Sequence, residues 1–470
     1  MDNTSHPVHH VVAPTSPAQK QPVLQADPLR PQGQPVAAAR RTSRLPGRFA
    51  RLPELAGPGF LPLGLFARLP LAMLTVGTLT LITAVSNSYA IGGMAAGAVG
   101  IGSAVGAPVL GSLADRAGQR AVLLAAAVIN TLAVAGLLAA AYLTPSYGSP
   151  VDALAVLVMA FVAGASCPQV GPMARVRWMA LTTRNLASPT TGHRSVAANR
   201  ADLDTALSYE GTADEITFVL GPALVGLLAS LVAPWLPLAL AAAMTITLVP
   251  AFAVHPSHLA VVPHPRKPRS AVVGSETAQP RRRWAMAVVA VPVLAMICMG
   301  TFFGATQNGL SAFGAAFATA EIAGLLYAVM GLSSAVAALS VAFWPQRFGL
   351  AARWVAAALA MSVLTVLLLL PAGLWSMIVV LLVLGIPVGP VMVTVFSIGG
   401  VVAPNGRMAT VMTALASGIV AGTALGAYLG GQLAQTQGYG GAFLVSMAAA
   451  GGLLLLGLVT WLVMRRKGKA

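Results

Sequence analysis

The chain contains 470 residues, of which 57% are hydrophobic and 9% are charged, and its mean hydropathy is +0.80. These values exclude an ordinary soluble globular domain. The formal net charge is +16. The basic residues are placed as expected for a membrane protein whose positive loops stay in the cytoplasm, so the charge does not require nucleic-acid binding.

Twelve apolar stretches are long enough to cross a bilayer as helices. A spanning helix needs about 20 residues, and it satisfies every backbone N–H and C=O group inside the membrane. The sequence therefore predicts an all-α membrane protein with twelve transmembrane helices. The stretches lie at 70–91, 93–113, 121–143, 152–174, 212–233, 235–254, 285–309, 322–343, 351–371, 375–397, 408–430 and 441–463.

The basic residues fall on one side of the predicted membrane. If both termini lie in the cytoplasm, all 28 Lys and Arg lie in the predicted inner segments or in the first turns beside them. The predicted outer loops, such as 144–151 and 310–321, contain none. Because positive loops are retained in the cytoplasm, this asymmetry predicts cytoplasmic N- and C-termini for a multi-pass protein of the cytoplasmic (plasma) membrane.

The two ends of the chain differ in composition from the spans. Residues 1–67 are rich in Pro, Ala, Gln and Arg, and we expect a cytoplasmic tail that is disordered over 1–50. We place residues 51–67 along the membrane surface, and their Pro and Gly argue against a regular helix. Residues 464–470 form a basic C-terminal tail.

A polar and basic segment at 255–284 divides the spans into two sets of six, and it is predicted to be a cytoplasmic linker. The predicted halves are 68–254 and 285–463. A faint repeat relates them, because the sequence at 347–353 is a degenerate copy of that at 116–120.

The loop between the second and third predicted spans reads GSLADRAGQR at 111–120 and is followed by Leu123. Gly111 and Gly118 lack the Cβ atoms that would hinder close helix approach and a tight turn. This pattern resembles the loop between spans two and three of major facilitator superfamily transporters. The resemblance implies two pseudo-symmetric six-helix halves, with a substrate path between them.

The same resemblance implies roles for the charged residues of this loop. The Asp115 carboxylate would meet the start of span eleven at 405–410, where helix N–H groups carry a partial positive charge, with Arg407 as a second candidate partner. Arg116 and Arg120 would bind inner-face carboxylates when the cytoplasmic side is closed. The alternative is that these charges only anchor the loop at the membrane interface.

Three of the 12 acidic residues lie close together, directly before the fifth predicted span. Their i,i+4 spacing places Glu210 and Asp214 on one helix face, with Glu215 beside them, and span four delivers Arg175 and Arg177 to the same side of the membrane. One hypothesis is a salt-bridged gate on the inner face. The other is that one carboxylate couples transport to protons, in which case Asp214→Asn abolishes pH-driven transport.

The fifth predicted span continues with Gly221, Pro222 and Gly226. This sequence resembles a motif of drug:proton antiporters in the superfamily, although Thr217 and Val225 stand where that motif has glycines. The resemblance favours efflux over uptake, and the alternative is a purely structural kink. The arginine that such antiporters usually carry early in span four has no counterpart here, so an uncoupled facilitator is also open.

Polar residues at the ends of the first and seventh predicted spans are the candidate substrate contacts, because these spans line the pathway in the family. They are Asn87, Tyr89, Gln307 and Asn308. Buried amides need hydrogen-bond partners, so each could instead join two helices. No basic residue is predicted in the middle of a span, which disfavours a strongly anionic substrate and favours a lipophilic or weakly polar one.

We therefore predict a secondary transporter that moves a small molecule by alternating access, with a proton gradient and no metal or other cofactor. Efflux of a drug or secondary metabolite is preferred, and import of a sugar or amino acid is the alternative. A membrane enzyme or a non-transporting sensor is less favoured, because the sequence has no catalytic or phosphate-binding motif and no appended folded domain. A monomer is expected by analogy with the fold.

Overall fold

In the computed structural model, helices make up the regular structure, and the described residues contain no strand. Residues 1–46 of the predicted tail 1–67 and residues 265–277 of the predicted linker 255–284 lie outside the described residues. All of the described residues belong to one compact unit, Pro46–Ala470. They are 47–147, 151–187, 196–264, 278–317 and 322–467.

Eleven helical stretches among the described residues are long and apolar enough to cross a membrane. The last of them, Met408–Leu462, contains Gly438, whose φ of 68° and ψ of −165° are not helical. One helix ends at this glycine and another begins, so this stretch holds two spans. The prediction of an all-α fold with about twelve membrane-spanning helices is confirmed.

The helices of the first six spans, which we call the first half, run from α3 to α9. They are α3 (Leu69–Ser86), α4 (Tyr89–Ala117), α5 (Gln119–Leu143), α6 (Leu154–Ala165), α7 (Val170–Ala187), α8 (Val196–Leu231) and α9 (Leu236–Val254). The second half consists of α10 (Ala278–Phe317), α11 (Ile322–Ser340), α12 (Leu350–Thr365), α13 (Leu374–Val402) and α14 (Met408–Lys467). Short 3-10 turns follow α9, α11 and α12, and they are η2 (Pro256–Ala260), η3 (Val341–Phe343) and η4 (Val366–Leu369).

Several predicted boundaries are wrong. The first span ends at Ser86 rather than at residue 91, because Asn87 adopts a left-handed conformation with a φ of 52°. The Ser88 hydroxyl then accepts a hydrogen bond from the Ile91 N–H and so caps α4. The fourth span is interrupted between α6 and α7, where Pro168 lacks the N–H of a continuing helix.

Two helices are longer than the hydrophobic pattern predicts. The helix of the fifth span begins at Val196, well before the predicted apolar start at residue 212, and α10 continues to Phe317 instead of ending at residue 309. Hydropathy marks only the part of a helix that is apolar, whereas the polar first turns of α8 are held by contacts with other helices. Asp202 and Asp204 in these turns are buried.

The segment before α3 is more regular than its Pro and Gly content suggests. It forms the 3-10 turn η1 (Arg48–Arg51) and the short helices α1 (Leu52–Ala56) and α2 (Phe60–Phe66). Gly57 and Gly59, with φ values of 97° and 82°, separate the two helices. The expectation that no single regular helix spans 51–67 is correct, but most of these residues are helical.

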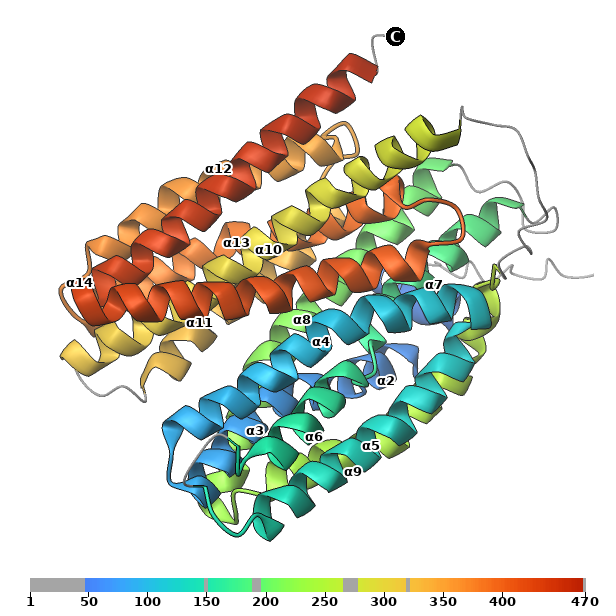
Figure 1. Ribbon diagram of the computed structural model, residues 1–470. Helices are drawn as coiled ribbons and strands as arrows, with labels where there is room; N and C mark the ends of the chain where they lie inside the picture. The colour runs from blue at the N-terminus through green and yellow to red at the C-terminus, as the bar shows by residue number, and fades with distance from the viewer. Residues whose placement is uncertain (1–46, 148–150, 188–195, 265–277, 318–321, 468–470) are drawn as a thin grey trace, which may run out of the picture. The chain divides into compact units, whose positions relative to one another are not determined.

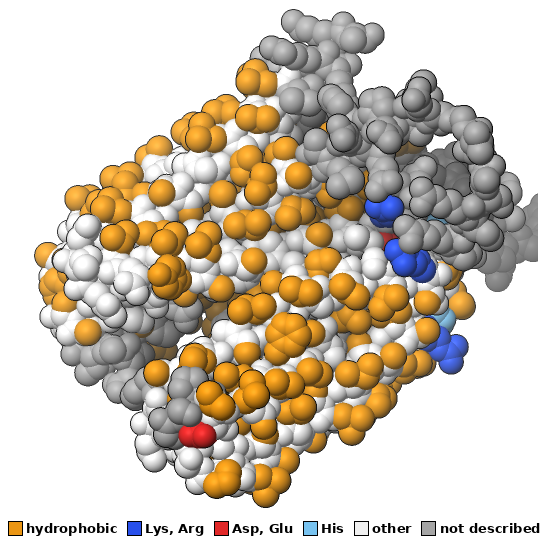
Figure 2. Space-filling view, in the orientation of Figure 1, with side chains coloured by type: hydrophobic (Ala, Val, Ile, Leu, Met, Phe, Trp, Pro, Cys, Tyr) orange, Lys and Arg blue, Asp and Glu red, His pale blue; other side chains and the backbone are white. Residues whose placement is uncertain are grey.

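The two halves pack against each other through α4 with α14 and through α8 with α11 and α13 (Figure 1). Large apolar side chains cover the sides of the helices, and the Lys and Arg visible in Figure 2 lie at its right-hand end. The exposed Arg116 and Arg120 lie where α4 meets α5. We call this end of the helices the basic end, and the positive-inside rule assigns it to the cytoplasm as a prediction.

Candidate functional site

Asp115, near the end of α4, binds the first turn of α14 in the second half. Its carboxylate accepts hydrogen bonds from the Ala409 N–H at 2.9 Å, from the Thr410 N–H at 2.8 Å and from the Thr410 hydroxyl at 2.6 Å. These N–H groups have no partner within their own helix, and they attract an anion. One turn earlier, a Cβ at Gly111 would collide with Thr413 Oγ1, so the glycine permits this close contact.

The other predicted residues of this loop do not bind carboxylates in this conformation. Arg116 and Arg120 are exposed, and neither forms an ion pair with a described carboxylate. Arg407 likewise forms no ion pair with Asp115, whose partners are the backbone and a hydroxyl. Gly118 separates α4 from α5 with a φ of 91°, a conformation that favours glycine.

A buried ionic cluster joins three helices of the first half. We use this name for Arg68, Arg175, Glu210 and Asp214. The Arg68 guanidinium binds Glu210 at 2.6 Å and Asp214 at 2.7 Å, and Arg175 binds the second oxygen of Asp214 at 2.6 Å. The indole N–H of Trp178 donates to the remaining oxygen of Glu210 at 2.9 Å.

The cluster supports the predicted spacing and adds a residue that the sequence reasoning missed. A single arginine reaches both Glu210 and Asp214, which agrees with the prediction that these two residues lie on one face of α8. That arginine, Arg68, directly precedes α3 and looks like the last residue of a tail. The signal that could have found it is the pair itself, because a buried carboxylate beside a half-buried one needs cations to balance the charge.

Arg177 and Glu215 do not join the cluster. Arg177 hydrogen-bonds Gln119 at 2.9 Å, the Phe252 carbonyl at 2.8 Å and the Ser257 hydroxyl at 3.0 Å, so it ties α7 to α5, α9 and η2. Its expected role in a salt-bridged gate with the acidic residues therefore has no counterpart here. Glu215 instead faces the second half, where Ser334 is its partner.

Arg175 connects the cluster to the second half. Its guanidinium lies over the Phe396 ring of α13, with 4.0 Å between the guanidinium carbon and the ring centroid. A cation over an aromatic face is attracted by the ring quadrupole. The cluster therefore lies next to a contact between the halves, and a charge change within it would be felt at that contact.

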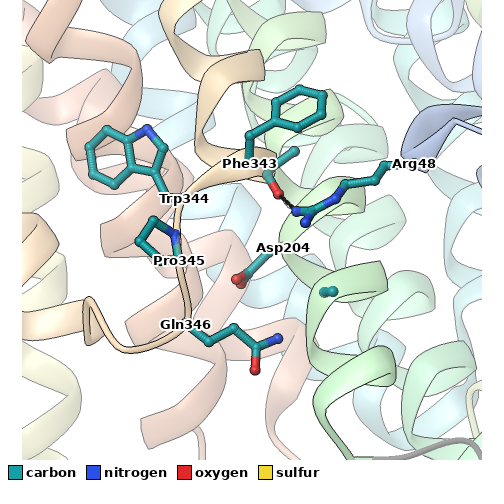
Figure 3. Close-up of a pocket in the computed structure, with 8 residues that line it drawn as sticks. Arg48, Asp204, Phe343, Trp344, Pro345 and Gln346 are labelled. Atoms are coloured by element: carbon teal, nitrogen blue, oxygen red, sulfur yellow. Dashed lines mark hydrogen bonds between the residues drawn. The ribbon is translucent and has the colours of Figure 1, made fainter.

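An ion pair between the two halves lies at the basic end and was also missed. Arg353, at the start of α12, binds Asp204 of α8 at 3.4 Å, and both side chains are buried. Figure 3 shows Asp204 facing the connection from Phe343 to Gln346, with Arg48 reaching the backbone carbonyl of Ala342. These groups line a pocket of about 350 Å³.

The predicted Gly-Pro motif lies inside α8, which continues through Pro222. A Cβ at Gly221 would lie 2.6 Å from the Ala72 Cβ of α3, so this glycine permits close helix packing. Gly226 faces open space, where a Cβ would meet nothing within 4 Å. Of the two glycines of the motif, Gly221 is therefore the one that the close packing of α8 on α3 requires.

The predicted substrate residues lie in different settings. Asn87 is exposed in the turn between α3 and α4, and Gln307 is exposed on α10. The Asn308 amide donates to the Ala427 carbonyl of α14 at 2.5 Å, so it joins two helices, the alternative allowed for such amides. The Tyr89 side chain lies outside the described residues.

The described residues offer no group of three His, Cys, Asp or Glu side chains that could hold a metal ion. What the arrangement provides is a set of polar contacts that cross from one half to the other at or near the basic end. Contacts of this kind can break and reform as two rigid halves tilt. They would suit a protein whose two halves move against each other.

The family model of the Major Facilitator Superfamily matches residues 60–417. The chain belongs to this superfamily. The family is one of membrane transporters, and the transporter prediction is confirmed at this level. The matched region covers the loop at 111–120 and both halves as far as the first turns of α14.

Solved structures with the same fold are also transporters. The human organic anion transporter MFSD10 (TETRAN) is 18% identical, with a TM-score of 0.59 and coverage of 87% of this chain and 98% of that chain. A bacterial homologue of the iron transporter ferroportin, in its outward-facing state, is 14% identical, with a TM-score of 0.60 and coverage of 85% and 97%. The E. coli fucose:proton symporter FucP is 16% identical, with a TM-score of 0.57 and coverage of 85% and 98%. At these identities the likeness shows the fold alone, and a search of curated proteins gives no significant match.

Proposed function

We propose that this superfamily member exports a small lipophilic or weakly polar molecule from the cytoplasm by alternating access, in exchange for protons. The observation that carries the proposal is the set of hydrogen bonds and ion pairs between the halves at the basic end. Asp115 with α14 and Asp204 with Arg353 are its clearest members. Their breakage would open the path between the halves on that side.

The expectation that no basic residue lies in the middle of a span was the ground for disfavouring an anionic substrate, and it stays a prediction. Arg68, Arg175 and Arg177 lie within candidate spans and are buried. The buried ionic cluster nevertheless has no excess positive charge, because two arginines face two carboxylates. The charge balance of the cluster gives a second ground for proposing a weakly polar substrate.

Efflux and proton coupling rest on the resemblance of the fifth span to drug:proton antiporters and on the acidic residues before it. The test is accumulation of a lipophilic dye in inverted membrane vesicles energised with a proton gradient, with wild type beside Asp115→Asn and Asp214→Asn. We expect gradient-dependent accumulation by wild type and its loss in both variants, with protein levels checked in the same membranes.

Other outcomes would redirect the proposal. Movement of the dye down its own gradient, without response to protons, would indicate an uncoupled facilitator. Absence of accumulation by wild type would contradict a broad lipophilic substrate range, and a screen of sugars, amino acids and metabolites would then test the importer. Sedimentation of the purified protein would test the proposed monomer, and fractionation of cell membranes would test the proposed plasma-membrane location.

A further inference from the structure

Glu215 lies in the contact between the two halves. Its side chain is buried on α8, with 6% of the residue exposed. One carboxylate oxygen accepts a hydrogen bond of 2.8 Å from the hydroxyl of Ser334, which lies on α11 in the second half. Close by on α8, the Thr212 hydroxyl donates to the Ala335 carbonyl at 3.0 Å. The environment of Glu215 therefore changes whenever α8 and α11 separate.

No cation among the described residues forms an ion pair with this carboxylate. Two arginines reach α8 just before this point, but Arg68 is bound to Glu210 and Asp214, and Arg175 is bound to Asp214. This contrast sets Glu215 apart from these two acidic residues of α8, whose charges are neutralised inside their own half.

The other groups around Glu215 do not replace a cation. Asp214 precedes it on α8 and bears a like charge. On α11, Tyr327 lies two helical turns from Ser334 and has its phenol on the same side. Helix α13, which packs Val393 against Gly211 of α8, contains no titratable residue between Leu374 and Val402. Helix α7 and the residue before α3 contribute the two arginines that are already paired.

We propose that Glu215 is the residue whose protonation controls the contact between α8 and α11. A buried carboxylate with one hydroxyl partner and no cation is costly, whereas the neutral acid fits the same site. When the helices separate, water reaches the side chain, the acid transfers its proton to water, and the carboxylate remains hydrated. Closure requires a proton to be taken up again, so one proton is bound for each closure at this end.

This inference rests on the alternating access of the proposed function and deepens its proton coupling. It assigns the proton to Glu215 rather than to Asp214, the carboxylate that the sequence alone singles out for mutation. Asp214 is held by two arginines, so it is suited to a structural role in the closed half.

The experiment measures the separation of the halves directly and needs no substrate. Spin labels at Val196 and Arg347 flank a hydrogen bond that joins the halves, from the Gln346 amide to the Ala197 carbonyl. The native Cys167 and Cys298 are replaced by Ala, and the full chain is placed in lipid nanodiscs. Electron paramagnetic resonance then gives the ratio of separated to closed molecules as a function of pH.

We expect this ratio in wild type to rise with pH, by up to about tenfold per pH unit, because one proton is linked to closure. In Glu215→Gln, a neutral side chain of the same shape, the ratio is expected to change by less than about twofold across the same pH range. Glu54→Gln, the same substitution at an exposed position, is the matched control and should behave as wild type. Ser334→Ala keeps the Glu215 carboxylate but removes its hydrogen-bond donor. This variant should shift the pH at the midpoint of the transition while the ratio still depends on pH.

Two outcomes would overturn the proposal, namely a wild-type ratio that does not depend on pH, or a pH dependence that survives in Glu215→Gln. Glu215→Gln gives no result if it does not insert into the membrane. In that case the proposal is overturned if Ser334→Ala has the same midpoint pH as wild type. Failure of the proposed export is distinguishable, because the labels would still show a Glu215-dependent response while the vesicles fail to accumulate dye.

Discussion

The first and fifth spans of each half pack against each other, yet the two pairs are held in different ways. In the first half, Arg68 at the start of α3 binds Glu210 and Asp214 on α8. In the second half, α10 and the first part of α14 meet through glycines that face the backbone of the other helix. These are Gly300, Gly304, Gly422 and Gly426.

The difference follows from where the acidic residues lie. Residues 285–463 contain a single acidic residue, Glu321, so α10 and α14 have no carboxylates with which to form a comparable cluster. Their glycines allow close backbone contact, which is fixed by shape and insensitive to charge. The carboxylates of the described spans therefore belong to the first half, and the second half contributes their partners Ser334 and Arg353.

The largest expected effect comes from breaking the ionic pair of the first half. Arg68→Ala leaves Glu210 buried with only the Trp178 indole as a partner, and we expect a loss of about 3–5 kcal/mol of stability. Thermal unfolding of the detergent-purified protein measures this loss. Arg68→Lys keeps the positive charge but loses the planar guanidinium that binds two carboxylates at once. The stability of this variant should fall between those of wild type and Arg68→Ala. An unchanged unfolding temperature for Arg68→Ala would show that the cluster does not hold α3 and α8 together.

The corresponding change in the second half is expected to cost less. In Gly422→Ala the new Cβ would collide with the Ile297 carbonyl of α10, and the helices must move apart at a cost of about 1–3 kcal/mol. Gly451→Ala, also on α14, has nothing within 4 Å of its Cβ and is the matched control. It should be neutral or slightly stabilising. Equal unfolding temperatures for the two variants would contradict the close packing of α10 on α14.

A smaller effect is expected where the two halves meet. Asp115→Asn retains a hydrogen-bond acceptor but loses the charge at the N-terminus of α14, a change of about 0.5–2 kcal/mol in favour of the open form. Spin labels at Val196 and Arg347 would report a shift toward separated halves. Arg116→Gln removes an exposed charge from the next position and should leave the equilibrium unchanged. A shift of the same size in both variants would mean that loop charge, rather than the cap on α14, controls closure.

The smallest effect is expected for Arg407→Gln. This residue precedes α14 and was the second candidate partner of Asp115, but it forms no ion pair with it. Surface substitutions of this type usually change stability by less than about 0.5 kcal/mol. The same spin-label measurement checks the expectation. A shift as large as that of Asp115→Asn would show that Arg407 binds Asp115 in solution.

The fold was predictable from the sequence because hydrophobicity is a local property of each span. The twelve apolar stretches and the motif at 111–120 were enough to identify the helices and the superfamily. The boundaries were harder, since the start of α8 at Val196 is polar and the break before α7 depends on Pro168. Capping and tertiary contacts, rather than hydropathy, decide where these helices begin and end.

The sequence by itself determined the class of protein, the number of spans and the group of acidic residues before the fifth span. Only the tertiary structure decided their partners. Arg68 and Glu210 are 142 residues apart in the chain, and no local pattern encodes which arginine reaches which carboxylate. The same packing places Glu215 against Ser334, and no cation among the described residues forms an ion pair with it. Ion pairing depends on how remote helices are rotated against each other, whereas membrane insertion depends on the composition of each segment.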